Sequence, residues 1–441
     1  MTTGNNNYFL SSDKFNKYFL YYITALLLFG IFYLYNKHDV GNDTSISEYL
    51  INYQGGFTRR GLVGEILFRI SDYFNLSLRF SIFIFQSIIY LSFLILIFNF
   101  FKDIKKNIII VFAIFTPIFL LFPIAEIESL GRKESVLFVF FLILININNP
   151  KNANLYLFLV LPLVTLIWEE STLFSGFMFA VLIIKNKIKN FIGASKIFLL
   201  FTPTILLNII FLLYPLSFEN HKIMADALML KFNETCYMSC LLLVTNTEIV
   251  LYDNANSSGS TLNYIWAAID VKSRLTMFFR YTIILLIGFF PIFLLSFNST
   301  FKSYNFFKKL FLNNILFLIF FLSIPIIPLF LFGGDWGRWV CISITFTTLF
   351  YFFLYKNNLI TVDYKNISRK LLFLKNKRKI VTILFILFAF TWNQKTTLRE
   401  DVATMPFYKI PYNAIKITFG INNIRFFQDS FLIKFHQKYI E

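Results

Sequence analysis

The sequence predicts an all-α fold, a polytopic bundle of about 11 transmembrane helices. Hydrophobic residues make up 57% of the 441 positions, charged residues make up 15%, and the mean hydropathy is +0.65. Several apolar runs approach the roughly 20 residues that a helix needs to cross a bilayer. A transmembrane β-barrel would instead show shorter segments of alternating polarity, and the sequence does not show them.

The first span is expected at 17–35, and a polar loop, 36–60, follows it. In the segment 61–78 the apolar residues fall mainly on one helical face, whereas Glu65 and Asp72 lie elsewhere. This pattern predicts an amphipathic helix that lies in the membrane interface. Further spans are expected at about 80–101, 108–122, 135–149, 155–168, 171–184, 197–217, 275–297, 314–332, 339–355 and 380–392.

The connections between the spans alternate in charge. One set carries 21 Lys and Arg residues against three acidic residues, and the complementary set carries 20 basic and 21 acidic residues. The basic set comprises the N-terminus, 102–107, 150–154, 185–196, 298–313 and 356–379. Because cytoplasmic loops are enriched in Lys and Arg, this asymmetry predicts a multi-pass protein of the cell inner (plasma) membrane with a cytoplasmic N-terminus.

The domain organisation follows from this orientation. We expect one transmembrane domain, 1–392, with outer loops at 36–79 and 218–274, and an extracytoplasmic C-terminal tail, 393–441. The first apolar run lacks the short core and small-residue cleavage site of a secretory signal, so we expect it to be retained as a helix.

The net charge of +17 does not indicate nucleic-acid binding, because the basic residues recur in short clusters between apolar runs. The three cysteines form no metal-binding pattern. Cys236 and Cys240 could form a local disulfide in an oxidising compartment or remain two reduced thiols, and Cys341 lies in an apolar run.

Four polar clusters are expected on the outer side. The first, which we call the Gly-Arg motif, is residues 54–65; it contains four glycines, two adjacent arginines and a glutamate. The second is the 126–134 motif, the third is the Glu169–Glu170 turn, and the fourth is the 333–339 motif. Their candidate site residues are Arg59, Arg60, Glu65, Glu126, Glu128, Arg132, Lys133, Glu169, Glu170, Asp335, Trp336 and Arg338. Asp43 lies in the loop that precedes the first cluster.

Each cluster also has a purely structural interpretation. Arg59 and Arg60 could extend to the membrane surface as anchors, and the acids and bases of the 126–134 motif could neutralise one another. Asp335 and Arg338 are three residues apart and could form a pair. The gathering of four clusters on one side favours a site, since an ionisable group at membrane depth costs about 2.5–3.5 kcal/mol.

Three of these segments resemble motifs of polytopic membrane proteins from bacterial surface-polysaccharide loci: Gly56–Leu62, Leu130–Glu134 and Asp335–Trp339. Such proteins are loosely assigned as membrane glycosyltransferases or O-antigen polymerases. The helix layout is also similar to that of GT-C glycosyltransferases, which implies a catalytic Asp or Glu in the first outer loop and a lipid-phosphate-sugar donor. This chain departs from that pattern because no tight Asp-Glu pair follows the first span.

The long loop 218–274 resembles the outer loop of O-antigen polymerases. Related ligases use an outer histidine, for which His221 is the only comparable candidate in this sequence.

The sequence therefore predicts a membrane glycosyltransferase or polysaccharide polymerase that uses polyprenyl-phosphate-linked or polyprenyl-pyrophosphate-linked glycans at the extracytoplasmic face. Its arginines would bind phosphate, because guanidinium groups match phosphate oxygens. One of Asp43, Glu128 and Asp335 would accept the proton of the acceptor hydroxyl. The other candidate residues would bind substrate.

No cofactor is implied by this reaction, although Glu126, Glu128 and Asp335 could hold a divalent cation. The alternatives are a transporter or flippase of lipid-linked glycans and a noncatalytic subunit of a cell-envelope assembly complex. A flippase needs polar groups along its whole path, and the nearly uncharged helix interiors disfavour it.

Overall fold

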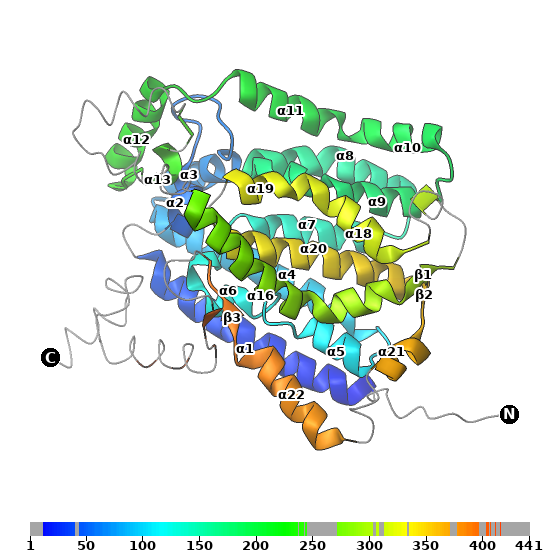
Figure 1. Ribbon diagram of the computed structural model, residues 1–441. Helices are drawn as coiled ribbons and strands as arrows, with labels where there is room; N and C mark the ends of the chain where they lie inside the picture. Colours follow the sequence, from blue (N-terminus) through cyan, green and yellow to red (C-terminus); the bar gives the residue numbers. More distant parts are fainter. Residues whose placement is uncertain are drawn as a thin grey trace.

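The computed structural model describes residues 12–39, 44–236, 238–241, 243–244, 271–302, 306–307, 313–332, 335–370, 377–396, 403–404, 406, 411 and 415. These residues form a bundle of helices with a two-stranded sheet at each end (Figure 1). The all-α prediction is confirmed. At one sheet, β1 (Ser299–Phe301) pairs antiparallel with β2 (Ile360–Val362); at the other, β3 (Asn393–Gln394) pairs antiparallel with β4 (Ala403–Thr404).

The helices have the following bounds in chain order: α1 Ser12–His38, α2 Thr44–Leu50, α3 Leu62–Phe74, α4 Leu78–Lys102, α5 Ile108–Ile114, α6 Phe122–Ala125, η1 Ile127–Ser129, α7 Glu134–Asn146, α8 Pro150–Ile167, η2 Glu169–Phe174, α9 Ser175–Lys185, α10 Phe191–Phe198, η3 Leu199–Phe201, α11 Thr202–Leu213, α12 Phe218–Phe232, α13 Met238–Leu241, α16 Val271–Phe297, α18 Ile315–Ser323, η4 Ile324–Ile326, α19 Ile327–Phe332, α20 Trp336–Lys356, α21 Tyr364–Lys370 and α22 Arg378–Phe390.

Within the described part of the chain, six helices are long and apolar enough to cross a bilayer, by length and composition. They are Asp13–His38, Leu78–Lys102, Pro150–Ile167, Phe191–Leu213, Phe278–Phe297 and Trp336–Lys356. Shorter apolar helices cover Glu134–Asn146, Ile315–Phe330 and Lys379–Phe390.

The segment 108–122 does not form the single span that its apolar run predicts. Helix α5 ends at Ile114, and α6 begins at Phe122 after an irregular turn. Pro117 and Pro123 lie in and just after this turn, and each lacks the N–H that a continuous helix requires. The two prolines therefore interrupt a segment that hydropathy alone predicts to be one continuous helix.

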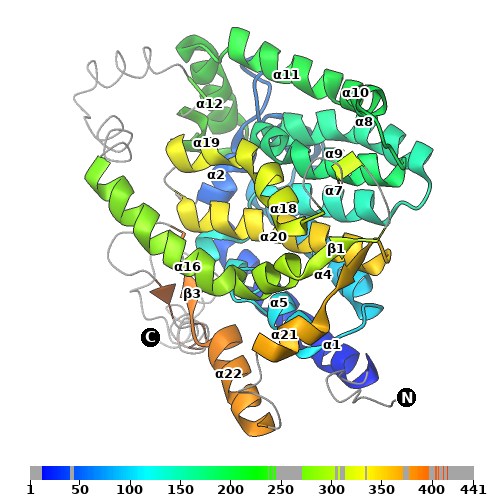
Figure 2. The same ribbon diagram turned by 45° about the vertical axis from the view of Figure 1, so that its right-hand side comes forward.

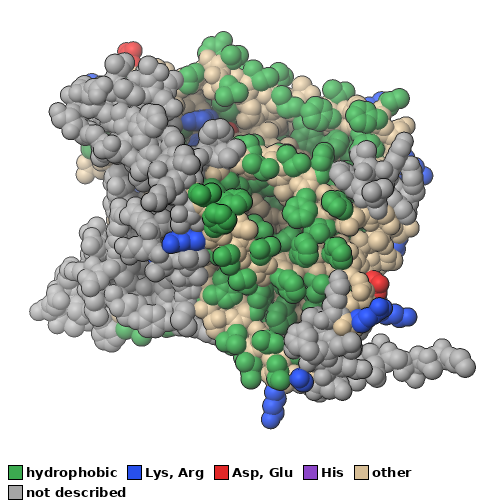
Figure 3. Space-filling view, in the orientation of Figure 1, with side chains coloured by type: hydrophobic (Ala, Val, Ile, Leu, Met, Phe, Trp, Pro, Cys, Tyr) green, Lys and Arg blue, Asp and Glu red, His purple; other side chains and the backbone are tan. Residues whose placement is uncertain are grey.

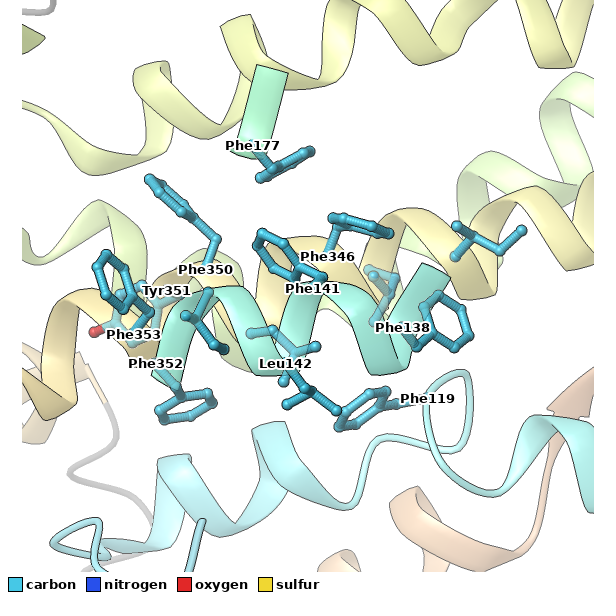
Figure 4. Packing of buried hydrophobic residues seen from close by; sticks show 14 of the residues in the cluster. Phe119, Phe138, Phe141, Leu142, Phe177, Phe346, Phe350, Tyr351, Phe352 and Phe353 are labelled. Atoms are coloured by element: carbon cyan, nitrogen blue, oxygen red, sulfur yellow. The ribbon is translucent and has the colours of Figure 1, made fainter. Parts of the chain in front are cut away.

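Helix α20 occupies the centre of the bundle and is buried along nearly its whole length. Its Phe346 ring packs 4.6 Å from Phe141 of α7 and 4.8 Å from Phe174, measured between centroids. Figure 4 shows Phe177 pointing towards the Phe346 and Phe350 side of this helix. Residues 336–339 form the first turn of α20, so the packing of this helix places that part of the 333–339 motif near the bundle axis.

The connections gather at two opposite ends, as the alternation in the sequence predicts (Figures 1 and 2). At the first, which we call the basic end, Lys356 donates to the Phe100 carbonyl, Asn154 hydrogen bonds with Asn186, and β1 pairs with β2. At the second, which we call the motif end, α2, α3, η1, η2 and the start of α20 come together.

Helix α3 forms where the amphipathic pattern predicts it, and its apolar residues divide between two directions. Val63 and Leu67 are buried against the protein, whereas Ile66, Ile70 and Tyr73 are exposed. The helix ends at Asn75, which adopts the left-handed conformation. An apolar stripe this broad lets one helix pack on the bundle and still present hydrophobic side chains outwards.

A cap formed by α12 and α13 covers the loop between α1 and α3. Ser239 hydrogen bonds with Ser47 at 2.7 Å, and Glu234 pairs with Arg79. Cys236 and Cys240 form a disulfide within this cap, which resolves the two alternatives that the sequence leaves open.

Candidate functional site

The Gly-Arg motif is a tight turn that packs against its own flanking helices. A Cβ on Gly64 would lie 1.8 Å from the Ile51 carbonyl oxygen, so only glycine permits α3 to approach this closely. The Glu65 carboxylate accepts hydrogen bonds from the Tyr53 backbone and from Gln54 at 2.9 Å each, and it pairs with Arg69. Glu65, expected to bind substrate, therefore holds the turn together in this structure.

Arg60 connects the Gly-Arg motif to the Glu169–Glu170 turn. Its Nε and Nη2 donate to the Glu169 carboxylate at 2.7 Å each, and Nη2 also donates to Glu170 at 2.9 Å. Burial alone would lower the pKa of Arg60, but the charges of Glu169 and Glu170 raise it above the ordinary value. Arg60 therefore carries a permanent positive charge that two carboxylates share.

Arg59 is the more open of the two arginines. Its Nη1 lies 3.5 Å from Glu169, and 39% of its side chain is exposed, against 20% for Arg60. Arg60 has a φ of 66°, in the left-handed region, so the chain reverses between the two residues. Both arginines contact the same acidic turn, and they differ in how much of the side chain is exposed.

The 126–134 motif reaches two other elements through Arg132 and Glu134. Arg132 donates to Glu48 of α2 at 2.7 Å and to Thr44 at 2.8 Å. Glu134 accepts two parallel hydrogen bonds from Arg338, both at 2.8 Å. Such bidentate pairs are the strongest that arginine makes with a carboxylate, and here they join α7 to α20.

Arg338 lies between charges and aromatic rings at the start of α20. Its Nη1 is 3.3 Å from Asp335, and its Nη2 is 3.6 Å from Glu48. The guanidinium carbon lies 4.9 Å from the Trp339 ring centroid and 5.9 Å from that of Trp168. Asp335 also lies 3.8 Å from Arg132, and a quarter of its side chain (25%) is exposed.

Lys133 is fully buried beneath the Gly-Arg motif. Its Nζ donates to the Arg60 carbonyl oxygen at 2.7 Å and lies 5.4 Å from the centroid of the Tyr49 ring. Burial lowers the pKa of Lys133 to about 7, even though Glu48 and Glu169 act in the opposite direction. This lysine supports the left-handed turn at Arg60 and is sealed from solvent.

Glu48 is the acidic centre of this network. Burial would raise the pKa of Glu48, but the charges of Arg132, Arg338, Lys133 and Arg60 together lower it to about 2. Its Oε2 atom has no hydrogen-bond partner among the residues that the structure describes. The same holds for Oε2 of Glu170, whose pKa burial raises.

The remaining predicted site residues take more peripheral positions. Glu126 is buried at the end of α6, and Glu128 contributes its carbonyl oxygen to Arg132. Trp336 packs 5.9 Å from Tyr281 and 5.4 Å from Phe330, measured between ring centroids. Asp43 and Gly333–Gly334 lie outside the described residues. His221, in the cap, stacks on Phe218.

The described parts of the chain contain no preformed set of metal ligands. No group of three or more His, Cys, Asp or Glu residues lies close enough there to hold an ion. The carboxylates that converge at the motif end instead face guanidinium groups, which already neutralise them.

Sequence reasoning missed two contributors to the site. Glu48 lies with Asp39 and Asp43 in the first outer loop, where the resemblance implies a catalytic Asp or Glu, but it is not among the candidate site residues because nothing local distinguishes it from the other two. The buried segment Asn393–Thr396 closes against the site from the far end of the chain: Gly337 donates to the Thr396 carbonyl at 3.1 Å, and Thr396 hydrogen bonds with Ser129 at 2.9 Å. A Cβ on Gly337 would lie 1.8 Å from the Lys395 carbonyl oxygen.

The structural interpretation that acids and bases neutralise one another is correct in part. Asp335 and Arg338 pair at 3.3 Å, as that interpretation expects. Arg132 and Glu134 of the 126–134 motif instead form their shortest pairs outside it, with Glu48 and Arg338, and Arg60 pairs with Glu169. The network therefore links α2, the Gly-Arg motif, α7, η2 and α20 at one point.

No family model, curated protein or solved structure matches this chain.

Proposed function

We propose that the chain is a multi-pass membrane glycosyltransferase or polysaccharide polymerase that acts on polyprenyl-linked sugars at its motif end. The observation that carries this proposal is the convergence of the described parts of the four motifs on two ion-pair clusters, one around Glu169 and one around Arg338, which the hydrogen bond from Lys133 Nζ to the Arg60 carbonyl joins. Asp335 and Arg59 keep 25% and 39% of their side chains exposed at these clusters. A buried network of this kind holds charged groups in place without reorganisation during a reaction.

Asp335 is the best-placed general base among the described candidates. A quarter of its side chain (25%) is exposed, while Arg132 and Arg338 orient its carboxylate. In the proposed step Asp335 accepts the acceptor hydroxyl proton as that oxygen bonds to the anomeric carbon of the donor sugar. The bond from this carbon to the carrier phosphate oxygen breaks, and the phosphate leaves with the electron pair.

The orientation that we propose places the basic end in the cytoplasm and the motif end outside. Two observations support it: the excess of Lys and Arg in the basic set of connections, and the disulfide at the motif end, since disulfides persist in oxidising compartments. The start of the tail, Asn393–Thr396, also lies at the motif end, which supports an extracytoplasmic tail after an odd number of crossings.

Labelling of single cysteines in intact cells tests this orientation. Lys222 of the cap and Lys187 beyond α9 are both exposed. With an impermeant maleimide, Lys222→Cys should react in intact cells and Lys187→Cys only after lysis. The reverse pattern would overturn the orientation.

Activity is tested with purified protein in liposomes that contain a polyprenyl-linked donor and a lipid-linked acceptor. Wild-type protein should release the polyprenyl phosphate or pyrophosphate, and Asp335→Asn should reduce the rate by about 100-fold or more, as for loss of a general base. Asp72→Asn is the matched control, because Asp72 pairs with Lys231 at the surface of the motif end.

Two outcomes would contradict the proposal. Full activity of Asp335→Asn, in a variant that unfolds at the wild-type temperature, would exclude Asp335 as the base. Movement of the lipid-linked sugar across the bilayer without release of the carrier would identify a transporter instead.

A further inference from the structure

Adjacent arginines in the Gly-Arg motif have different environments. Arg60 is held by two carboxylates, and its backbone carbonyl is held by the buried Lys133. Arg59 Nη1 lies 3.5 Å from Glu169 of the same turn, and 39% of the Arg59 side chain is exposed. Arg60 is thus the more buried and more tightly held of the two side chains, and Arg59 is the more exposed.

The surroundings of Arg59 are apolar on one side. Phe57, two residues earlier, is exposed and stacks 5.8 Å from Phe211 of α11, measured between ring centroids. The last residues of α11 and the next one, Leu212, Leu213 and Tyr214, are also exposed. Asn208 of α11 donates to Thr172 of η2 at 2.9 Å, which fixes this end of α11 beside the acidic turn that Arg59 contacts.

The surface shows the same combination. Figure 3 shows basic and acidic atoms inside a hollow between the ends of α11 and α19, with hydrophobic side chains along both helices. Helix α11 belongs to one of the segments apolar enough to cross a bilayer, so hydrophobic residues here would face lipid tails. Charged groups in a hollow bordered by such residues suit a ligand that is anionic at one end and apolar along its length.

We propose that this place is a binding site for the phosphate headgroup of a membrane lipid. Arg59 binds the phosphate, and Phe57 with the end of α11 contacts the first part of the hydrocarbon chain. A guanidinium fork matches phosphate oxygens, and exposed aromatic and aliphatic side chains contact isoprenoid or acyl chains. The identity of this lipid as a substrate carrier rests on the proposed function; the binding site itself does not.

The chain offers a matched control in Arg69. It lies on α3 at the same end, its side chain is 65% exposed, and it also has exposed apolar neighbours, Ile70 and Tyr73. Arg69 pairs with Glu65 and lies outside the acidic turn. If any interfacial arginine attracts anionic lipid, substitution of Arg59 and of Arg69 should weaken lipid binding equally. If Arg59 belongs to a specific binding site, only its substitution should weaken binding.

Binding of undecaprenyl phosphate to the purified full-length protein, measured by native mass spectrometry from detergent, tests the proposal. Arg59→Gln should weaken binding by about fivefold, as expected for one interfacial cation, and Arg69→Gln should leave it unchanged. Phe57→Ala should weaken it as well. Undecaprenol, which lacks the phosphate, should bind less tightly than undecaprenyl phosphate and should not distinguish Arg59→Gln from wild type.

Several results would overturn the site. They are unchanged binding by Arg59→Gln, an equal loss in Arg59→Gln and Arg69→Gln, or undecaprenol binding as tightly as undecaprenyl phosphate. Phosphatidylglycerol supplies the second arm: Arg59-dependent binding of this lipid with equal affinity would support the site and assign it to bilayer phospholipid.

The site and the proposed function fail separately. Asp335→Asn should bind undecaprenyl phosphate as wild type does, even though it lacks transfer activity. If the protein binds lipid through Arg59 but never releases the carrier phosphate, the lipid-binding site is supported and the proposed transferase function is contradicted.

Discussion

The lysines that donate to helix ends at the basic end and the arginines of the motif end are held in different ways. At the basic end, Lys185 donates to the carbonyl oxygens of Ile145, in the last turn of α7, and Ile147. Lys356 donates to the Phe100 carbonyl in the last turn of α4. At the motif end, Arg60, Arg132 and Arg338 instead pair with carboxylates from other elements.

This difference distinguishes lysines that cap the ends of helices from arginines that join separate elements at the candidate site. The last carbonyl groups of a helix lack partners within the helix and carry partial negative charge, so a lysine beside them satisfies a local need. An arginine paired with a distant carboxylate satisfies no local need, and it is costly to bury unless the pairing is complete. The basic end is therefore expected to tolerate single changes that the motif end does not.

Removing one member of the central pair should have the largest effect. Arg338→Met leaves Glu134, Asp335 and Glu48 with less positive charge around them, and breaking a buried pair typically costs about 3–5 kcal/mol. Thermal unfolding in detergent should show this loss. The double variant Glu134→Leu with Arg338→Met should recover a large part of it, and Arg69→Met should cost little. A double variant as unstable as Arg338→Met would show that the pair is not the cause.

The buried lysine predicts a dependence on pH. Because the folded-state pKa of Lys133 is about 7 against an ordinary 10.5, the unfolded chain binds the extra proton between these values. Stability should therefore rise with pH from about 7 to about 10, by up to about 1.4 kcal/mol per pH unit, with no contribution from this group to the slope below pH 7. Lys133→Met should remove this slope from the thermal unfolding profile, and Lys222→Met, at an exposed position, should not. Equal slopes of stability against pH in all three proteins would contradict the assignment of this slope to Lys133.

The close approach of α3 predicts an intermediate effect. Gly64→Ala would bring a Cβ to 1.8 Å from the Ile51 carbonyl oxygen, so the backbone must shift, at a cost of about 1–3 kcal/mol. Gly176→Ala, where the nearest backbone atom lies at 3.2 Å, should cost less in the same unfolding assay. If both variants are as stable as wild type, α3 is not held as tightly as the motif end requires.

The smallest effect is expected at the basic end. Lys185→Met removes hydrogen bonds to two helix-terminal carbonyls that water can replace, and should cost about 1 kcal/mol. The same unfolding measurement compares it with Arg338→Met. A loss as large as that of Arg338→Met would erase the distinction between the two ends.

Much of the architecture is predictable from the sequence because the determining patterns are local. Apolar runs predict α1, α4, α16 and α20, and the broad apolar stripe after Gly61 predicts α3. Where prediction failed, as at 108–122, prolines broke the helix despite the hydropathy. Alternation along the chain also sorts the connections to two ends, because consecutive long helices must reverse direction.

The pairing within the motif end depends on tertiary structure. Alternation brings Glu48, Arg132, Glu134 and Arg338 to one end, but it does not say which helices are neighbours there. Glu134 and Arg338 are 204 residues apart, and they meet because α20 packs against α7 through residues such as Phe346 and Phe141.

The sequence likewise does not reveal that the adjacent residues Arg59 and Arg60 have different environments. It arises because a left-handed turn, supported by Lys133 from another helix, gives the two side chains different environments. The sequence by itself determined most of the helical segments and the end at which the described charged clusters lie, since both follow from the local pattern of apolar side chains. Tertiary packing alone decided which charges neutralise one another, because a charge is neutralised only by a neighbour that the fold brings within a few ångströms.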